Sequence, residues 1–286
     1  MSRELDVIGL QGFVGSGMAD RLRDSINHAP TKSELDITKK DDIHDFLHCS
    51  NAKFVLLLSA YTNVDKAQTD KFGAHAVNVS GTRMVSDLCR ETSKHLIFIS
   101  TDFVFSGSRT NPGPYSTSDK TETQSSLSIG EYARTKILAE RAVADSGCRH
   151  SIIRISYPFG NPGNEKDFVL KTLRLVQKGY PLFSDQQFSP TYIPDLAKAI
   201  ETILTKNLTG IYHVACTPVT TPFEFGKYLV EKLKLDLEVI SGSLESFMIG
   251  KTPKPLCGGL IPSSEFQVHP WKSAVDKTSA EVEKVI

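Results

Sequence analysis

Two side chains with complementary chemistry lie four residues apart near the middle of the chain. Tyr132 and Lys136 belong to the run YARTK, which precedes the apolar-periodic residues of a predicted helix. A spacing of four places both side chains on one helical face. Because an ammonium group beside a phenol stabilises the phenolate, Lys136 should lower the pKa of Tyr132. The pair predicts a proton donor for a carbonyl oxygen near neutral pH, with a solvated surface pair as the alternative.

A glycine-rich turn follows the first apolar run. Residues 5–8 (LDVI) are typical of a strand, and glycines at every third position precede a helix-like stretch. Glycines let the backbone approach a pyrophosphate, and a helix N-terminus offers free N–H donors. The spacing is G-x-x-G-x-x-G, not the G-x-G-x-x-G of ordinary dinucleotide folds, and a plain turn is the alternative. The expected cofactor-binding residues here are Gly9, Gly12, Phe13, Val14 and Gly15.

A second apolar run ends in a hydroxyl side chain. Residues 95–100 (HLIFIS) are typical of a buried parallel strand, and Thr101 follows directly. Open α/β sheets carry their chemistry at the carboxyl ends of such strands. Thr101 is therefore a candidate to hydrogen-bond a substrate carbonyl oxygen, although a threonine at the end of a strand also caps turns.

The glycine turn, the strand before Thr101 and the YARTK run occur in this order, and other segments accompany them. These are LDIT at 35–38, AYTNVDKA at 60–67, VN at 77–78, STDFVF at 100–105, SPTY at 189–192 with Asp195, and GIYHV at 210–214. Together they resemble the dTDP-4-dehydrorhamnose reductase family of the extended short-chain dehydrogenase/reductase superfamily. The same family includes the regulatory subunit of methionine adenosyltransferase. The resemblance extends from residue 5 to residue 230.

The resemblance implies NADPH- or NADH-dependent reduction of a 4-keto-6-deoxy sugar linked to a nucleoside diphosphate. Tyr132 would protonate the carbonyl oxygen, Lys136 would hold the nicotinamide ribose, and Thr101 would orient the carbonyl. Further residues implied at the cofactor are Lys32, Asp36, Ile37, Ser59, Ala60, Tyr61, Thr62 and Asn78. Those implied at the substrate are Val64, Asp102, Phe103, Tyr157 and Lys254. For Asp36 the alternative is a cap at the turn into the next helix.

The cofactor is expected to be NADP, with NAD also usable. NAD sites place an acidic residue after the second strand to hold the ribose diol. Residues 28–32 (HAPTK) contain no acid, and Lys32 could meet a 2′-phosphate instead.

The substrate side departs from the family pattern. Phe103 stands where the family usually has tyrosine, Tyr157 where reductases have tryptophan, and Phe188 where glycine is usual. Lys254-Pro255 replaces an arginine-proline pair, and arginine is the better bidentate phosphate ligand. Weaker or different nucleotide binding is therefore expected, and Lys171 or Arg174 could bind the diphosphate instead. An NADP-binding regulatory subunit and a nucleotide-sugar epimerase or dehydratase are the alternative functions.

Composition favours an ordinary globular protein. The 286 residues include 33 basic and 33 acidic ones, which gives no global basic field for nucleic acid. No signal-peptide pattern and no membrane-length apolar run occur. The five cysteines have no metal-type spacing and suit a reducing compartment. We expect a cytoplasmic protein that has no metal site. We expect it to bind neither a membrane nor nucleic acid, and it could form a homodimer.

Strand-like and helix-like runs alternate through the first 155 residues. This alternation predicts an α/β, Rossmann-type doubly wound parallel sheet with a smaller C-terminal substrate-binding lobe. Residues 1–155, with 186–215 returning to them, should form the dinucleotide-binding unit, and 156–185 with 216–286 the lobe. Strands are expected at 5–9, within 25–29, and at 53–59, 95–100 and 151–155. Helices are expected from residue 15, near 41–48, and at 74–92, 132–145, 168–178, 192–205 and 223–233, and a long surface loop at 106–131.

Overall fold

Six parallel strands form the central sheet of the protein. The structure is a computed structural model that describes residues 3–282 and residue 284. The strands lie in the order β2-β1-β3-β4-β5-β7, and every neighbouring pair is parallel. Their bounds are β1 Leu5–Ile8, β2 Ile26–His28, β3 Phe54–Leu57, β4 His95–Thr101, β5 Arg149–Ile155 and β7 Gly210–His213. The predicted α/β doubly wound sheet is therefore confirmed.

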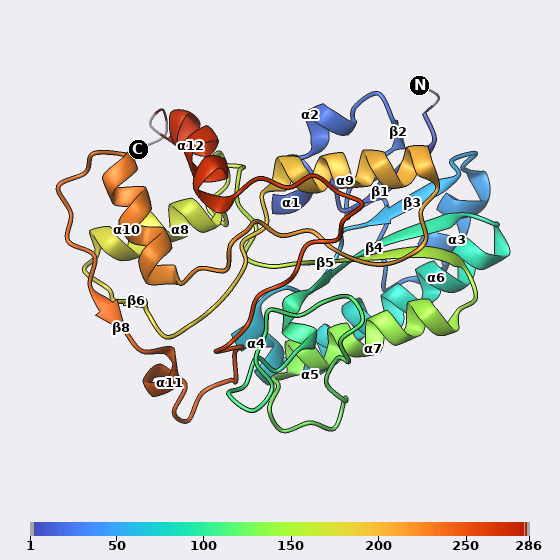
Figure 1. Cartoon of the computed structure of the whole chain (residues 1–286). Coiled ribbons are helices and arrows are strands. Elements are labelled where there is room, and N and C mark those ends of the chain that lie inside the picture. Colours follow the sequence, from blue (N-terminus) through green and yellow to red (C-terminus); the bar gives the residue numbers. More distant parts are fainter. Residues whose placement is uncertain (1–2, 283, 285–286) are drawn as a thin grey trace.

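Helices cover both faces of the sheet because both faces are apolar. Alternate strand residues point to opposite faces, so Leu5 and Val7 of β1 contact one apolar cluster and Ile8 contacts the other. The first cluster is covered by α2 (Ala19–Leu22) and α9 (Ile193–Lys206), and the second by α3 (Lys40–Cys49), α6 (Thr82–Glu91) and α7 (Glu131–Asp145). Figure 1 shows α9 on one side of the strands and α6 with α7 on the other.

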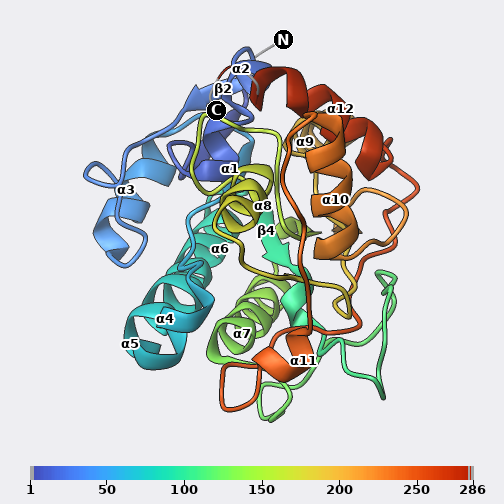
Figure 2. The same cartoon turned by 90° about the vertical axis from the view of Figure 1, so that its left-hand side faces the viewer.

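Segments beyond the sheet form a third apolar cluster with its own small sheet. Three helices pack around Phe225 and Trp271: α8 (Phe168–Gln177), α10 (Pro222–Lys232) and α12 (Trp271–Val282). A two-stranded sheet, β6 (Leu182–Phe183) with β8 (Ser241–Gly242), and the short α11 (Leu244–Phe247) lie next to them. Figure 2 shows this group from the side. The division of the chain into two lobes stays a prediction.

Two predicted helices are interrupted. The helix expected from residue 15 is two short pieces, α1 (Phe13–Ser16) and α2. The helix expected at 74–92 consists of α5 (Lys71–His75), a π-helical turn at Ala76–Gly81, and α6, and it follows α4 (Val64–Thr69). The Asn78 side chain lies inside this π-helical turn. It accepts a hydrogen bond from Tyr61 N (2.8 Å) and donates to Tyr61 O (3.1 Å).

The loop expected at 106–131 is not a free surface loop. Its residues from 106 to 130 contain no helix or named strand, yet Tyr115 and Ile129 are buried. Tyr115 N donates to Gly259 O (2.9 Å), and Ile261 N donates to Tyr115 O (2.8 Å). The Tyr115 ring also stacks on Phe105 at 4.1 Å. The loop is therefore anchored to the segment near residue 260.

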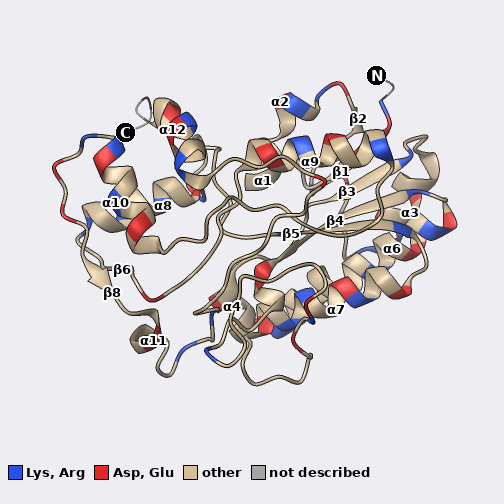
Figure 3. Ribbon diagram, viewed as in Figure 1, with Lys and Arg blue, Asp and Glu red and all other residues tan. Residues whose placement is uncertain are grey.

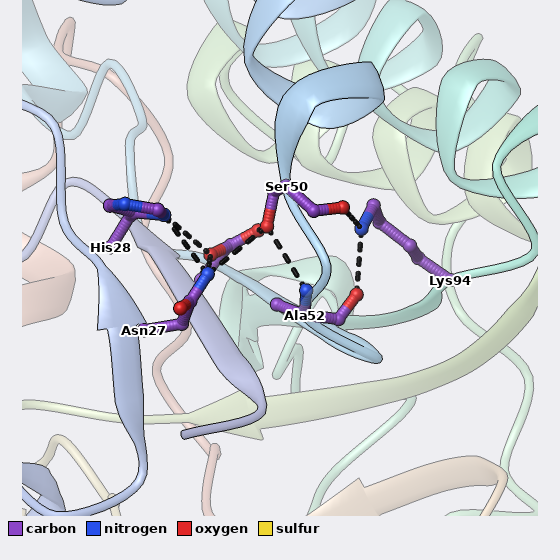
Figure 4. Close-up of polar contacts among 6 residues, drawn as sticks. Asn27, His28, Ser50, Ala52 and Lys94 are labelled. Atoms are coloured by element: carbon purple, nitrogen blue, oxygen red, sulfur yellow. Dashed lines mark hydrogen bonds and ion pairs between the residues drawn. The ribbon is translucent and has the colours of Figure 1, made fainter. Parts of the chain in front are cut away.

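A buried polar network joins β1, β2 and the turns before β3 and β4 (Figure 4). The fully buried Asp6 carboxylate accepts from Asn27 Nδ2 (3.0 Å) and Ser50 Oγ (2.5 Å). Lys94 Nζ donates to the carbonyl oxygens of Ser50 (2.7 Å) and Ala52 (2.6 Å). These bonds satisfy polar groups that would be costly to bury alone. They fasten the strands on the side away from the glycine turn.

Charges are mixed over the surface. Figure 3 shows basic and acidic residues interspersed along α7 and α10. Among the described residues, no helix is both long and apolar enough to cross a membrane.

Candidate active site

A large cavity opens at the carboxyl ends of the central strands. The chain leaves β1 for β2 on one side and returns with β3 on the other, so the loops after β1 and β3 diverge. Open α/β sheets bind ligands at such a switch point. The cavity volume is about 1390 Å³, above the roughly 300–1,000 Å³ of ordinary small-ligand pockets. It has room for a dinucleotide together with a second ligand.

All predicted site residues except Asn78 line this cavity. On the expected cofactor side these are Gly9, Gly12, Phe13, Val14, Gly15, Lys32, Asp36, Ile37, Ser59, Ala60, Tyr61 and Thr62. The expected catalytic and substrate residues are Thr101, Tyr132, Lys136, Val64, Asp102, Phe103, Tyr157 and Lys254. Asn78 lies behind the wall, where it holds the Tyr61 backbone and donates to Thr135 Oγ1 (2.9 Å). Asn78 therefore positions the Tyr61 loop, and its contact with the cofactor stays a prediction.

The glycine turn fits the close approach of a phosphate. Gly9 has a φ of +95°, and a Cβ there would lie 2.7 Å from Ser59 Oγ. A Cβ on Gly15 would lie 2.4 Å from Leu10 O. Both positions thus require glycine. Phe13 and Val14 form the first turn of α1, where backbone N–H groups have no intrahelical partner. The turn can therefore hold the pyrophosphate of a dinucleotide.

Asp36 lies after β2 and holds the turn at Thr38, while its role at the cofactor stays a prediction. Its Oδ1 accepts from Thr38 N (2.9 Å) and Thr38 Oγ1 (2.8 Å), which lowers the pKa of Asp36. Asp36 therefore fixes its own turn and also borders the cavity. Lys32 is exposed and lines the same end of the cavity.

Tyr132 is half-buried and lies against Thr101 and Phe103. Its ring meets Phe103 edge-on at 5.8 Å. Burial raises the pKa of Tyr132 to about 12, the Asp102 charge adds to the rise, and a hydrogen bond with the Thr101 side chain opposes it. The expected lowering of the Tyr132 pKa is thus wrong for this structure, because the loss of solvation outweighs any effect of Lys136. Tyr132 keeps its proton at neutral pH.

Lys136 lies one turn further along α7 and is buried. Its Nζ donates to Ile99 O (2.8 Å) and lies 4.0 Å from the centroid of the Phe98 ring. Burial lowers the pKa of Lys136 to about 7, and the Glu140 charge opposes this. Glu140 in turn is paired with Arg154, with Oε2 to Nη2 at 2.7 Å. The buried ion pair of Glu140 and Arg154 therefore lies near Lys136 and fixes the position of the Glu140 charge.

Asp102 occupies the floor of the cavity. Ser156 Oγ donates to Asp102 Oδ2 (2.6 Å), and Thr101 Oγ1 donates to Oδ1 (3.1 Å). Burial raises the pKa of Asp102 to about 6, although both hydrogen bonds oppose the rise. Tyr157 follows Ser156 with a φ of +40°, a conformation that is unusual for a side chain of this size.

The Tyr157 side chain is fixed by neighbours of the third apolar cluster. Its ring packs against Phe168 (5.0 Å) and Phe188 (4.8 Å). Gln186 Nε2 donates to Tyr157 Oη (2.8 Å), and burial raises the pKa of Tyr157. Phe188 therefore supports Tyr157 from behind and does not line the cavity.

Two further lysines line the side of the cavity where the substrate is expected. Lys166 and Lys171 border the cavity, whereas Arg174 does not. Lys254 also borders it, and its Nζ lies 3.7 Å from Asp65 Oδ2. Burial, followed by the Lys166 charge, lowers the pKa of Lys171. Lys166 was not predicted from the sequence, because it belongs to no motif and only the fold brings it to the cavity.

The chain and its structure are similar to those of known proteins. Residues 3–281 match the family described as the RmlD substrate binding domain. A dTDP-4-dehydrorhamnose reductase from Mycolicibacterium smegmatis is 32% identical over 83% of this chain and 72% of its own length. A dTDP-4-dehydrorhamnose reductase from Mycobacterium tuberculosis is 30% identical over 82% of this chain and 77% of its own length. The crystal structure of dTDP-4-dehydrorhamnose reductase from Bacillus anthracis with NADP has a TM-score of 0.88 at 25% identity, and covers 98% of this chain and 100% of its own.

Proposed function

This chain belongs to the RmlD substrate binding domain family, and we propose that it is an NADPH-dependent reductase of a 4-keto-6-deoxy sugar carried on a nucleoside diphosphate. One observation carries the proposal. Thr101, Tyr132 and Lys136 border the same cavity as a glycine turn that tolerates no side chain. A proton donor and a dinucleotide cradle thus open onto one space that also has room for a second ligand.

Each of the three catalytic residues has a distinct role in this proposal. Tyr132 donates its proton to the carbonyl oxygen of the sugar, and its high pKa suits it to the reductive direction because it stays protonated. Thr101 holds the same oxygen by a hydrogen bond. Lys136 contacts the nicotinamide ribose and, when charged, stabilises the phenolate that remains on Tyr132. NADPH supplies a hydride when it is bound.

NADPH fits the cofactor side of the cavity. The glycine turn would hold the pyrophosphate, and Asp36 with Ile37 would border the adenine. Ser59, Ala60, Tyr61 and Thr62 would line the middle of the cofactor, with Asn78 holding their loop in place. Lys32 at the far end would meet a 2′-phosphate, which favours NADPH over NADH. The Bacillus anthracis relative with NADP supports the same choice.

The substrate side would be supplied by residues 156–185 and 216–286, the smaller lobe of the proposal. Lys166, Lys171 and Lys254 would bind the diphosphate. Val64, Asp102, Phe103 and Tyr157 would border the sugar. Lysines bind phosphate as point charges rather than through a bidentate fork, so they would replace the arginine of the family pattern with looser geometry.

The location, the partners and the assembly of the protein are also proposed. Free cysteines agree with action in the cytoplasm. The mixed surface charge favours neither nucleic acid nor an anionic membrane as partner. A homodimer is the proposed assembly, by analogy with the family.

The test is a steady-state assay of NADPH consumption with a dTDP-4-keto-6-deoxy sugar, alongside NADPH and NADH titrations of the free protein. We expect turnover that needs both the sugar and the cofactor, and tighter binding of NADPH than of NADH. Tight NADPH binding without turnover on any nucleotide-linked keto sugar would reject the reductase proposal and favour the regulatory-subunit function. A strong preference for NADH would reject only the proposed role of Lys32 and would leave the reductase proposal standing.

A further inference from the structure

Three side chains that could bind a metal ion gather on two neighbouring helices, away from the cavity. His44 and His48 lie on α3, and Glu91 lies at the end of α6. One potential ligand atom of each residue lies within 4.8 Å of the others. None of the three lines the candidate active site. We propose that His44, His48 and Glu91 form a surface site for a divalent transition-metal ion such as Zn²⁺.

Both histidines are oriented so that the same nitrogen is available. His48 Nδ1 lies 3.0 Å from His44 O, and because a carbonyl only accepts, Nδ1 carries the proton. His44 Nδ1 lies 3.2 Å from Asp45 Oδ1, which likewise only accepts. A neutral imidazole protonated at Nδ1 has its lone pair on Nε2. Metal-binding histidines are held in this way, with the second ring N–H donated to a carbonyl or a carboxylate.

The distance between His48 and Glu91 agrees with a tetrahedral site, and the ligand atom of His44 lies within 4.8 Å of both. His48 Nε2 lies 3.3 Å from Glu91 Oε1. Two ligand atoms bound at about 2.0–2.1 Å to a tetrahedral ion are separated by roughly 3.3–3.4 Å. His44 reaches the same place because a spacing of four puts it beside His48, with ring centroids 4.1 Å apart. Two imidazoles and one carboxylate leave the fourth position to water.

Helix geometry adds to the attraction for a cation. His48 is in the last turn of α3, and Glu91 is the final residue of α6. The C-terminus of each helix carries partial negative charge, and here two such ends meet. The two helices already pack through one apolar cluster that includes Ile43 and Leu88. An ion would therefore tie together two ends whose separation is already set, with little ordering cost.

The motif was visible in the sequence only in part. The two histidines have the spacing of a helical metal pair, but their third ligand comes from a helix further along the chain. The expectation of no metal site rested on cysteine spacing alone. The proposed histidine–carboxylate site uses none of the cysteines, and the zinc titration decides between it and that expectation.

The experiment is isothermal titration of Zn²⁺ into the full chain, freed of any polyhistidine tag. Wild type is compared with the single variants His44→Asn, His48→Asn and Glu91→Gln. His75→Asn removes another exposed histidine, and Cys49→Ser removes the thiol next to His48. Thermal unfolding with zinc and with EDTA is recorded for each protein, and circular dichroism checks that each variant is folded.

We expect one ion per chain, and each ligand variant should weaken binding by at least about tenfold, since even loss of a group that only orients a ligand costs 10–100-fold. His75→Asn and Cys49→Ser should bind like wild type, and zinc should raise the unfolding temperature only in proteins that bind it. Loss of affinity on acidification is also expected, because only neutral imidazole binds the ion. The proposal is overturned if millimolar zinc gives no single-site heat, or if the three ligand variants bind as wild type does. The His48–Glu91 contact would then be an ordinary surface ion pair.

Discussion

The buried pair of Arg154 and Glu140 offers a direct test of how the catalytic edge is supported. The substitution is Glu140→Gln, which keeps the size of the side chain and one acceptor oxygen. In the structure Glu140 accepts from Arg154 Nε (3.0 Å), Arg154 Nη2 (2.7 Å) and Ser100 Oγ (2.5 Å). Both members of the pair are almost fully buried. Gln removes the charge but leaves the guanidinium in place without its counter-ion.

The expected loss of unfolding free energy is about 3–5 kcal/mol, because breaking one side of a buried ion pair strands the other charge. The matched control is Glu201→Gln, which breaks a similar Arg21 contact (Nε 2.9 Å and Nη2 2.6 Å) on the surface. Exposed pairs contribute only about 0–1 kcal/mol. A double variant with Glu140→Leu and Arg154→Met should recover much of the loss, since it removes both charges together.

Urea unfolding of the four proteins measures these differences, with an unchanged m-value as the check that the unfolded states are comparable. The same substitution should weaken NADPH binding near neutral pH, because the Glu140 charge opposes the fall of the Lys136 pKa. If Glu140→Gln costs no more than Glu201→Gln, the pair does not support the site as argued. If the double variant is less stable than Glu140→Gln, the loss comes from packing and not from the stranded charge.

Three further outcomes are expected. Tyr132→Phe should lower turnover by about 10²–10⁴-fold, the range for a lost proton donor, while fluorescence titration shows unchanged NADPH binding; wild-type turnover would exclude the mechanism. Lys171→Met should raise the KM for the nucleotide sugar by roughly ten- to a hundredfold, from about 1.5–3 kcal/mol per charged hydrogen bond, with little change in kcat. Lys178→Met, which lies on the same segment but not at the cavity, is its control, and equal effects of the two would argue against a diphosphate contact. Burial lowers the pKa of His213 to about 4, below the roughly 6.5 of an unfolded chain, so the unfolded state binds its proton first and stability is lost as pH falls from about 6.5 toward 4. In His213→Gln the unfolding free energy should therefore fall by up to about 3 kcal/mol less than in wild type between these pH values. Urea unfolding at several pH values measures this, and an identical pH dependence in the variant would refute it.

The elements nearest the chemistry were the ones that local sequence predicts well. A strand, a glycine turn and a helix leave a local pattern, and so does a tyrosine four residues before a lysine. For that reason the chain order alone brought Gly9, Thr101 and Tyr132 to one sheet edge. The sheet topology then followed from the alternation of strands and helices.

What the sequence did not predict depends on burial and on contacts between distant segments. The spacing of Tyr132 and Lys136 indicates that they share a helical face, but it does not show how much solvent reaches that face. The predicted direction of the Tyr132 pKa shift was therefore wrong. Lys166 lies in a loop without periodicity, and only the tertiary fold brings it to the cavity. The π-helical turn around Asn78 depends on a bond to Tyr61, a residue outside that helix.

The Asp6 network has a consequence for the order in which the molecule assembles. Asp6 and Ser50 are 44 residues apart, and so are Ser50 and Lys94. Closing loops of this length costs chain entropy before any contact forms. The network can therefore be completed only once β1, β3 and β4 already lie side by side, which makes its bonds late events in folding. These bonds should therefore slow unfolding and leave the rate of folding almost unchanged, so they stabilise the sheet kinetically after it has formed.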